Sequence, residues 1–286
     1  MSVKKFIGVL TGLLVVATLS AQKPKSYNLK VGQEFTLNVL VESYSEQDIM
    51  GQKQVINQNV NNVDKYEVVS KDADGYRLKV TGLRRKVLMS GMAGDIDMDS
   101  AEEGEEHLAM RALTGKVYFM NISKYGKVMQ IDDFAAYKEE IKTGFEGTSL
   151  AGQGDQVLAS VTEENAQTTF ESFFYIYSPT GEKNWQNEYT MTLNALPVNI
   201  SLDYSRPAAN QVVANGKLEL SGDIDLQGMT MQAELSGTQV TTFELDKKTG
   251  LSNKVEISQT LSGDIKMQSI TVPMTVETKS TATISW

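Results

Sequence analysis

Apolar and polar residues alternate along most of this chain of 286 residues. The alternating apolar residues form four clear runs: Phe35, Leu37, Val39 and Val41; Tyr76, Leu78 and Val80; Tyr189, Met191 and Leu193; and Val198, Ile200, Leu202 and Tyr204. Because every second side chain of a β-strand lies on the same face, each run predicts a strand with one buried face. No regularly spaced helical segments separate the runs, which argues against a parallel α/β sheet. The pattern therefore predicts a mainly β fold.

Residue pairs that contain glycine separate such runs and mark the expected turns. These pairs are Asp74-Gly75, Tyr125-Gly126, Asn215-Gly216 and Thr249-Gly250. Glycine tolerates the positive φ angles that tight hairpin turns require. We therefore expect neighbouring strands to be joined by hairpins and to run antiparallel.

Helical spacing replaces the alternation in the middle of the chain. Asp132 and Asp133 can cap a first helix. Its apolar residues are Phe134, Tyr137, Ile141 and Phe145, followed by Gly147. A second set begins near Asp155 with Val157, Leu158 and Val161, and continues as Phe170, Phe173, Phe174 and Tyr177 until Pro179. An exposed aromatic stripe of this size would favour aggregation, so we expect the stripes to pack on a sheet.

Short strings recur on both sides of this helical centre. They are GDIDM at Gly94, GDIDL at Gly222 and GDIKM at Gly263, and also GKVYFMNISKYGKV from Gly115 and GTQVTTFELDKKTGLSNKV from Gly237. Chance similarity between strands is the alternative to a true repeat. We interpret the strings as two related β halves, residues 22–132 and 179–286, on either side of a helical segment at 133–178. The expected fold class is mainly β (α+β): antiparallel curved sheets or half-barrels in two related halves, with the central helices packed on them.

Residues 1–21 have the layout of a secretory signal peptide. Lys4 and Lys5 precede an apolar run that ends at Leu19, and small residues follow. The run has about 14 residues, fewer than the roughly 20 that a membrane-spanning helix needs, and an uncleaved anchor is the alternative. We expect export to the periplasm or the cell exterior, with a mature chain that begins near Gln22. Since no cysteine is present to carry a lipid, we expect no stable membrane insertion after the leader is removed.

The charge balance argues against nucleic acid and anionic lipid surfaces as partners. The chain has 27 Lys and Arg against 36 Asp and Glu, a net charge of −9. Without Lys4 and Lys5 the count is 27 − 2 = 25, so the mature net charge is 25 − 36 = −11. The densest basic run, Arg84-Arg85-Lys86, is too short to neutralise a nucleic-acid backbone. The partners that remain are an apolar ligand or an envelope protein.

The residue inventory removes most metal and redox chemistry. The chain has no cysteine and one histidine, His107, which excludes disulfides, thiolate zinc sites and sites that need two histidines. Four carboxylates coincide with ligand positions of an EF-hand calcium loop: Asp95, Asp97, Asp99 and Glu106. However, Ser100 occupies the glycine position of that loop and Glu102 an apolar position. We therefore expect a strand with Ile96 and Met98 inward that leads into a solvated acidic loop, and neither a metal nor a cofactor.

No motif for catalysis stands out. A G-x-S-x-G nucleophile elbow is absent. The pairs Asp132-Asp133 and Glu139-Glu140 supply the residue type of a glycosidase, but adjacent side chains diverge in direction and do not face each other across a cleft. We expect that the protein is not an enzyme and that no residue is catalytic.

Several segments together resemble a known kind of protein. They are the leader ending Leu-Ser-Ala-Gln, the opening strand VGQEFTLNVLVES, Asp99-Ser100 before an irregular loop, GKVYFMNISKYGKVMQI before a helix, Asn184-Trp185, and GTQVTTFELDKKTGL. On these segments the chain resembles a family of secreted, cysteine-poor proteins of unknown function from Gram-negative bacteria of the Bacteroidota kind. The resemblance implies an extracytoplasmic β-rich fold and assigns no activity.

The leading hypothesis for function is a non-enzymatic binding or carrier module. It would hold an apolar or amphipathic ligand between a curved sheet and the helices. The candidate ligand-cavity residues are Phe170, Phe173, Phe174 and Tyr177. Two alternatives remain: an envelope structural or interaction protein, and a carboxylate-based hydrolase. An apolar cavity would favour the carrier, a flat exposed patch the interaction protein, and two facing carboxylates the hydrolase.

Overall fold

The computed structural model describes most of the chain after the predicted leader. The described residues are 25–49, 51–91, 94–148, 154–159, 161–193, 196–226, 229–267 and 270–286. The predicted signal peptide and its cleavage site lie outside them.

Strands account for most of the described residues. In the first half of the chain they are β1 (Glu34–Ile49), β2 (Gln52–Lys71), β3 (Gly75–Ser90), β4 (Ile96–Asp99), β5 (Val117–Ser123) and β6 (Val128–Asp132). In the second half they are β7 (Asn184–Leu193), β8 (Leu196–Ala208), β9 (Gln211–Leu226), β10 (Met229–Leu245), β11 (Ser252–Met267) and β12 (Ile270–Ser285). The described helices are α1 (Leu108–Ala112), α2 (Phe134–Thr143), α3 (Gly154–Ala159) and α4 (Glu163–Phe174). None of them is long and apolar enough to cross a membrane.

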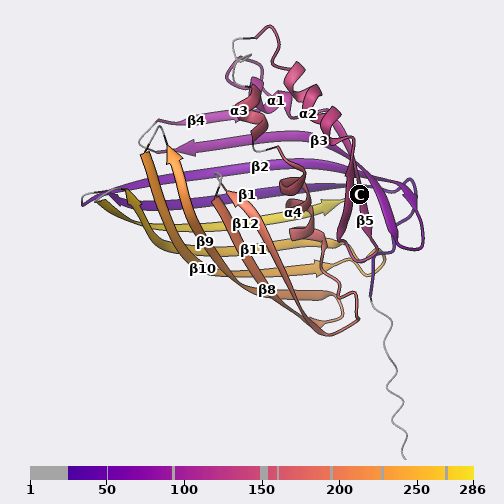
Figure 1. Cartoon of the computed structure of the whole chain (residues 1–286). Helices are drawn as coiled ribbons and strands as arrows, with labels where there is room; N and C mark the ends of the chain where they lie inside the picture. Colours follow the sequence, from indigo (N-terminus) through magenta and orange to yellow (C-terminus); the bar gives the residue numbers. More distant parts are fainter. Residues whose placement is uncertain are drawn as a thin grey trace, which may run out of the picture.

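All twelve strands belong to one open antiparallel sheet, so the predicted fold class is confirmed. The order is β6-β5-β3-β2-β1-β12-β11-β10-β9-β8-β7, with β4 beside β3. β1 pairs with β12, from Thr36 opposite Ser285 to Gln47 opposite Met274, so the first and last strands meet in the middle of the sheet. The two ends of this order are β6 and β7, which follow each other in sequence. The segment with α2, α3 and α4 therefore joins opposite edges of the sheet (Figure 1).

The core lies on the concave face of this sheet, where the strands curve around α4 (Figure 1). Residues of β8 alternate between buried and exposed from Leu196 to Tyr204, as the period-two pattern predicts. On β1, Phe35 is buried, and its ring stacks on Tyr66 of β2 at 5.1 Å between centroids. Phe174 of α4 lies 5.9 Å from each of these two rings. Burial of each such side chain stabilises the fold by about 1.5–3 kcal/mol.

The helix ends differ in part from the predicted ones. α2 begins directly after Asp133, but this side chain makes no capping hydrogen bond, and its backbone φ is 62°. α4 begins after Thr162, whose hydroxyl accepts a backbone N–H at 3.1 Å. It ends at Phe174, because Tyr175 has a ψ of 69°, outside the helical range. Tyr177 consequently lies beyond the helix and does not belong to its apolar face.

Three of the four predicted turns join strands. They are Asp74-Gly75 between β2 and β3, Tyr125-Gly126 between β5 and β6, and Thr249-Gly250 between β10 and β11. The fourth prediction, Asn215-Gly216, is wrong, since both residues lie inside β9. A Cβ on Gly216 would lie 2.3 Å from Leu202 Cδ2, so this glycine makes room for a neighbouring leucine. Gly126 is required for two reasons. Its φ is 93°, which favours glycine, and a Cβ there would lie 1.9 Å from the carbonyl oxygen of Phe174.

The recurring strings occupy unlike positions. The string at Gly94 leads into β4, a strand of four residues that pairs with β3. The strings at Gly222 and Gly263 lie inside the long strands β9 and β11. The expected inward position of Ile96 is wrong: this residue is 38% exposed, because Asp99 on the opposite face of β4 is the residue turned toward the protein. The relatedness of the two halves stays a prediction.

Candidate functional site

A cavity of about 360 Å³ lies between the concave face of the sheet and the helices, and we call it the α4 cavity. Strands β2, β3 and β5 and helices α1, α2 and α4 contribute to its wall. Its apolar lining includes Val60, Val87, Met110, Leu113, Val161 and Phe170. Its polar lining includes Asn62, Asp64, Arg85, Thr162 and Asn165. The cavity is therefore amphipathic.

An ion pair between Asp64 of β2 and Arg85 of β3 forms part of this wall. Arg85 Nη2 donates to Asp64 Oδ1, and Arg85 Nη1 donates to the backbone carbonyls of Val63 at 3.1 Å and Arg84 at 2.8 Å. The Arg85 and Asp64 side chains are 17% and 19% exposed. Burial opposes the positive charge of Arg85, but the attraction and hydrogen bond of Asp64 outweigh it and raise the pKa of Arg85. The two charges cancel, so the pair adds no net charge to the cavity.

Three tyrosine rings, Tyr66, Tyr118 and Tyr137, also line the α4 cavity. Tyr118 and Tyr137 meet edge to face with centroids 5.1 Å apart. Burial raises the pKa of all three phenols, and the Asp64 carboxylate raises it further. The phenols are therefore neutral at physiological pH. A neutral tyrosine offers an apolar ring and a polar hydroxyl, which suits a ligand with both kinds of surface.

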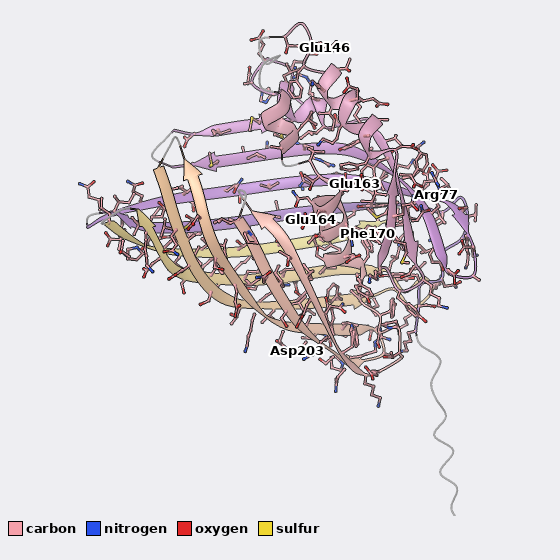
Figure 2. All side chains as sticks on the ribbon, viewed as in Figure 1. Arg77, Glu146, Glu163, Glu164, Phe170 and Asp203 are labelled. Atoms are coloured by element: carbon pink, nitrogen blue, oxygen red, sulfur yellow. The ribbon has the colours of Figure 1, made fainter. Side chains whose placement is uncertain are left out.

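The four aromatic residues predicted for a ligand cavity are all buried. Phe170, Phe173, Phe174 and Tyr177 are 2%, 6%, 0% and 4% exposed. Phe170, labelled in Figure 2 on the concave side of the sheet, lines the α4 cavity. All four residues belong to the main core cluster, and Tyr177 also lines a different pocket. The burial predicted from the spacing is confirmed, and a role of these residues in ligand binding stays a prediction.

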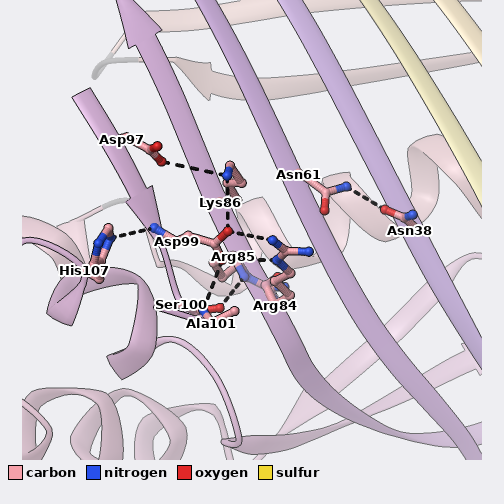
Figure 3. A network of polar contacts seen from close by, with 10 residues as sticks. All are labelled: Asn38, Asn61, Arg84, Arg85, Lys86, Asp97, Asp99, Ser100, Ala101 and His107. Carbon is pink, nitrogen blue, oxygen red and sulfur yellow. Dashed lines mark hydrogen bonds and ion pairs between the residues drawn. The ribbon is translucent and has the colours of Figure 1, made fainter. Parts of the chain in front are cut away.

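The acidic segment is anchored to the sheet through Asp99, as Figure 3 shows. Its carboxylate accepts hydrogen bonds from Arg84 Nε at 3.1 Å and Nη2 at 2.6 Å, and Lys86 Nζ lies 3.3 Å away. Its backbone N–H donates to His107 Nδ1 at 3.0 Å. The bonds from Arg84, and then those from Ala101 N–H and Lys86, hold the pKa of Asp99 well below its usual range despite burial. The prediction of a solvated acidic loop is wrong for Asp99, which is 1% exposed, because β4 pairs with the strand that carries these cations.

No metal-binding cluster is assembled in the described part of the chain. No three His, Asp or Glu side chains there lie together in a way that could hold a metal ion. Asp132, one of the paired carboxylates in the sequence, is bound by Arg77 at 2.7 Å. The described lining of the α4 cavity contains one carboxylate, Asp64. The described lining of this cavity therefore offers apolar contacts and hydrogen-bonding groups.

The Asp64–Arg85 pair was not predicted from the sequence. The two residues lie on strands joined by the predicted turn at Asp74-Gly75. Equal steps from the first observed pair, Lys71 with Tyr76, bring Asn62 opposite Arg85, as observed. The sequence could have indicated this ion pair, because residues of opposite charge stand at nearly opposite positions on neighbouring strands. The bulge between Val63 and Asp64 shifts the register and has no evident mark in the sequence.

Comparison with known families shows the relationship of the chain. The model described as "Family of unknown function (DUF6263)" matches residues 73–252, more than half of the chain. The chain belongs to this family. The matched DUF6263 region contains Arg85 and all the described helices, while Asp64 precedes it. No curated protein shows significant similarity to the chain.

Solved structures resemble the chain only distantly. A structure on lipid–protein interactions in lipovitellin is 7% identical and has a TM-score of 0.48, with 91% of this chain and 26% of that chain covered. An outer membrane channel from Pseudomonas putida F1 is 9% identical, with a TM-score of 0.37 and 91% and 98% covered. OpdQ from Pseudomonas aeruginosa is 5% identical, with a TM-score of 0.20 and 89% and 99% covered. The chain thus spans about a quarter of the lipovitellin chain. Similarities at these TM-scores carry no argument about function.

Proposed function

We propose that the protein is a non-enzymatic binding or carrier module for an amphipathic ligand and that it acts in the periplasm or on the cell exterior. The observation that carries the proposal is the α4 cavity, whose wall combines apolar side chains with an internally neutralised ion pair. Its volume of about 360 Å³ falls within the range of about 300–1,000 Å³ typical of small-molecule sites. The predicted signal peptide at 1–21 supports the location.

The wall of the cavity favours a ligand with an apolar body and an uncharged polar group. Val60, Val87 and Phe170 supply apolar surface for the body. The Asn62 amide and the tyrosine hydroxyls supply hydrogen-bonding groups. Because the charges of Asp64 and Arg85 are already matched, a charged group in the same space would lack a counter-charge and lose its hydration.

Filling the cavity tests the proposal. Ala166 of α4 lines the cavity, and Ala136 of α2 is exposed, so Ala166→Phe and Ala136→Phe are matched substitutions. Fluorescence titration with Nile red, a neutral apolar dye, should show saturable binding to the wild type. Ala166→Phe should weaken it about tenfold or more, a loss of about 1.4 kcal/mol, and Ala136→Phe should leave it unchanged. Circular dichroism of both variants checks that they fold.

Two outcomes would contradict the carrier proposal: no saturable dye binding by the wild type, or equal binding by Ala166→Phe. The envelope interaction protein would then be the better account. β6 and β7 have no strand on their outer side among the described residues, and an open strand edge is a surface on which another chain can pair. A hydrolase gains no support from this cavity, because its one described carboxylate, Asp64, is paired with Arg85.

A further inference from the structure

A second pocket, of about 250 Å³, lies beyond the C-terminal end of α4, where the chain enters β7 and leaves β8. We call it the Arg206 pocket. Its lining includes Tyr177, Trp185 and Arg206, with Lys25 and Lys183 exposed. No described residue lines both this pocket and the α4 cavity, so we treat the two as separate sites.

Positive charge dominates the Arg206 pocket. Among the described lining residues, Lys25, Lys183 and Arg206 stand with one carboxylate, Glu182, which gives a local formal charge of 3 − 1 = +2. The whole chain, in contrast, has a net charge of −9. None of the three cations forms an ion pair with a residue that the structure describes. Burial, and then the charge of Arg206, lower the pKa of Lys25, as expected for cations that share a site without a counter-charge.

Some hydrogen-bond donors in this pocket lack acceptors among the described residues. The Arg206 guanidinium lies over the Tyr177 ring, 5.1 Å from its centroid. Arg206 Nε and Nη2 are buried and have no hydrogen-bond partner among the described residues. The same is true of the indole Nε1 of Trp185, a residue that is 9% exposed. Buried polar groups are nearly always satisfied in native proteins, so three unsatisfied nitrogens beside one pocket require an explanation.

Arg84 of the same protein shows what the Nε and Nη2 nitrogens of a guanidinium can bind. Its Nε and Nη2 hold the two carboxylate oxygens of Asp99 at 3.1 and 2.6 Å. The same two nitrogens of Arg206 are buried and have no carboxylate against them among the described residues. Two parallel N–H donors of arginine match the spacing of two oxygens in a carboxylate or a phosphate.

From these observations we infer that the Arg206 pocket binds a phosphate group. A phosphate monoester carries about −1.5 to −2 charges at neutral pH, which matches the local charge of the pocket, whereas a carboxylate supplies only one. The Arg206 guanidinium supplies one positive charge and hydrogen-bond donors, and Lys25 and Lys183 neutralise the remaining charge. This inference stands on different residues from the carrier proposal and does not depend on it.

Calorimetric titration of the purified protein with inorganic phosphate at low ionic strength tests the inference. The wild type should bind, and Arg206→Gln should weaken binding by more than about tenfold, because it removes the guanidinium charge and its donors. Lys183→Gln should weaken phosphate binding severalfold. It should not disturb the core, since Lys183 is exposed and unpaired among the described residues. If Arg206→Gln does not fold, Lys183→Gln therefore tests the inference. Lys279→Gln, an equal charge change at an exposed position of β12, should leave binding unchanged.

Vesicles distinguish the two sources of a phosphate group. Vesicles of phosphatidylcholine with and without phosphatidic acid are sedimented with each variant. Binding that requires both phosphatidic acid and Arg206 assigns the pocket to a lipid head group, and binding of inorganic phosphate alone assigns it to a soluble phosphate. The inference is overturned if the wild type binds neither inorganic phosphate at millimolar concentration nor these vesicles, or if both pocket variants bind as the wild type does.

Discussion

Two groups of three cations occupy different parts of this molecule and have opposite surroundings. The β3 cations are Arg84, Arg85 and Lys86, and the pocket cations are Lys25, Lys183 and Arg206. Each β3 cation has a carboxylate partner: Asp99 for Arg84, Asp64 for Arg85, and Asp97 and Asp99 for Lys86. The pocket cations have no such partner among the described residues.

This difference separates a structural role from a binding role. The ion pairs of the β3 cations join β3 to β2 and β4 and leave the α4 cavity without net charge. When one partner of a buried ion pair is removed, the other is left unpaired, and the fold loses stability. A cation that is already unpaired has no such stability to lose. Substitutions near β3 should therefore destabilise the protein, and substitutions of the pocket cations should mainly change ligand binding.

The largest effect is expected at α4, which lies between the two groups. Phe174 is fully buried, and its ring centroid lies 4.4 Å from that of Phe170 and 5.9 Å from that of Phe35. Phe174→Ala should lower the free energy of unfolding by about 3–5 kcal/mol. Urea denaturation followed by circular dichroism and tryptophan fluorescence should give one coincident transition if both cation groups belong to a single cooperative unit. Glu140→Ala, at an exposed position of α2, is the control. Wild-type stability, or two separate transitions, would contradict this expectation.

The next-largest loss of stability should follow when Arg85 loses its carboxylate partner and becomes unpaired, as Arg206 already is. Asp64→Asn keeps the shape of the side chain and removes the charge that Arg85 needs. We expect a loss of about 2–3 kcal/mol, less than the 3–5 kcal/mol of a fully buried pair, since both side chains keep some contact with water. Adding Arg85→Met to Asp64→Asn should restore part of the loss, as a double-mutant cycle in urea would show. If Asp64→Asn is as stable as the wild type, the β3 cations do not differ from the pocket cations.

Elements that depend on local pattern were predictable from the sequence. The alternation in β8 and the aromatic spacing in α4 each reflect burial of one face, and both faces are buried as expected. Glu171 shows the limit of this reasoning. It lies among the aromatic residues of α4 at a position that the pattern marks as exposed, but it accepts the backbone N–H of Val128 at 2.9 Å, and burial raises its pKa.

Features that depend on distant residues were not predictable. The pairing of β1 with β12 brings together residues from opposite ends of the described chain, and no local pattern encodes it. The two cation groups show the same limit. The β3 cations appear in the sequence as a basic run, although their charge is neutralised by Asp64 and Asp99. The pocket cations come from three distant segments and become a group only in the folded protein.

A pH dependence should distinguish Arg84 from Arg206. Hydrogen bonds from Arg84 lower the pKa of Asp99 below its value in the unfolded chain, so the stability from this pair is fully present above the unfolded pKa and is lost as the pH falls. Asp99→Asn should cost about 1–3 kcal/mol near neutral pH. The difference from the wild type should shrink as the pH falls below about 4. Urea denaturation at a series of pH values measures this difference in unfolding free energy between the wild type and Asp99→Asn. If the difference stays constant with pH, Asp99 acts through packing alone.

The smallest effect on stability is expected at Arg206, which represents the pocket cations in the comparison with the β3 cations. Because Nε and Nη2 of Arg206 have no described acceptor, Arg206→Gln removes a buried cation without leaving a carboxylate unpaired. In phosphate-free buffer its free energy of unfolding should stay within about 0.5 kcal/mol of the wild type or exceed it, the range of substitutions that break no paired group. Added phosphate should then stabilise the wild type more than Arg206→Gln, because a ligand that binds only the folded state raises its stability. A loss of about 2 kcal/mol or more without phosphate would instead show that Arg206, through its contact with the Tyr177 ring, is part of the core. The unsatisfied nitrogens would then be a cost of that packing, and the contrast with Arg84 would no longer indicate a ligand.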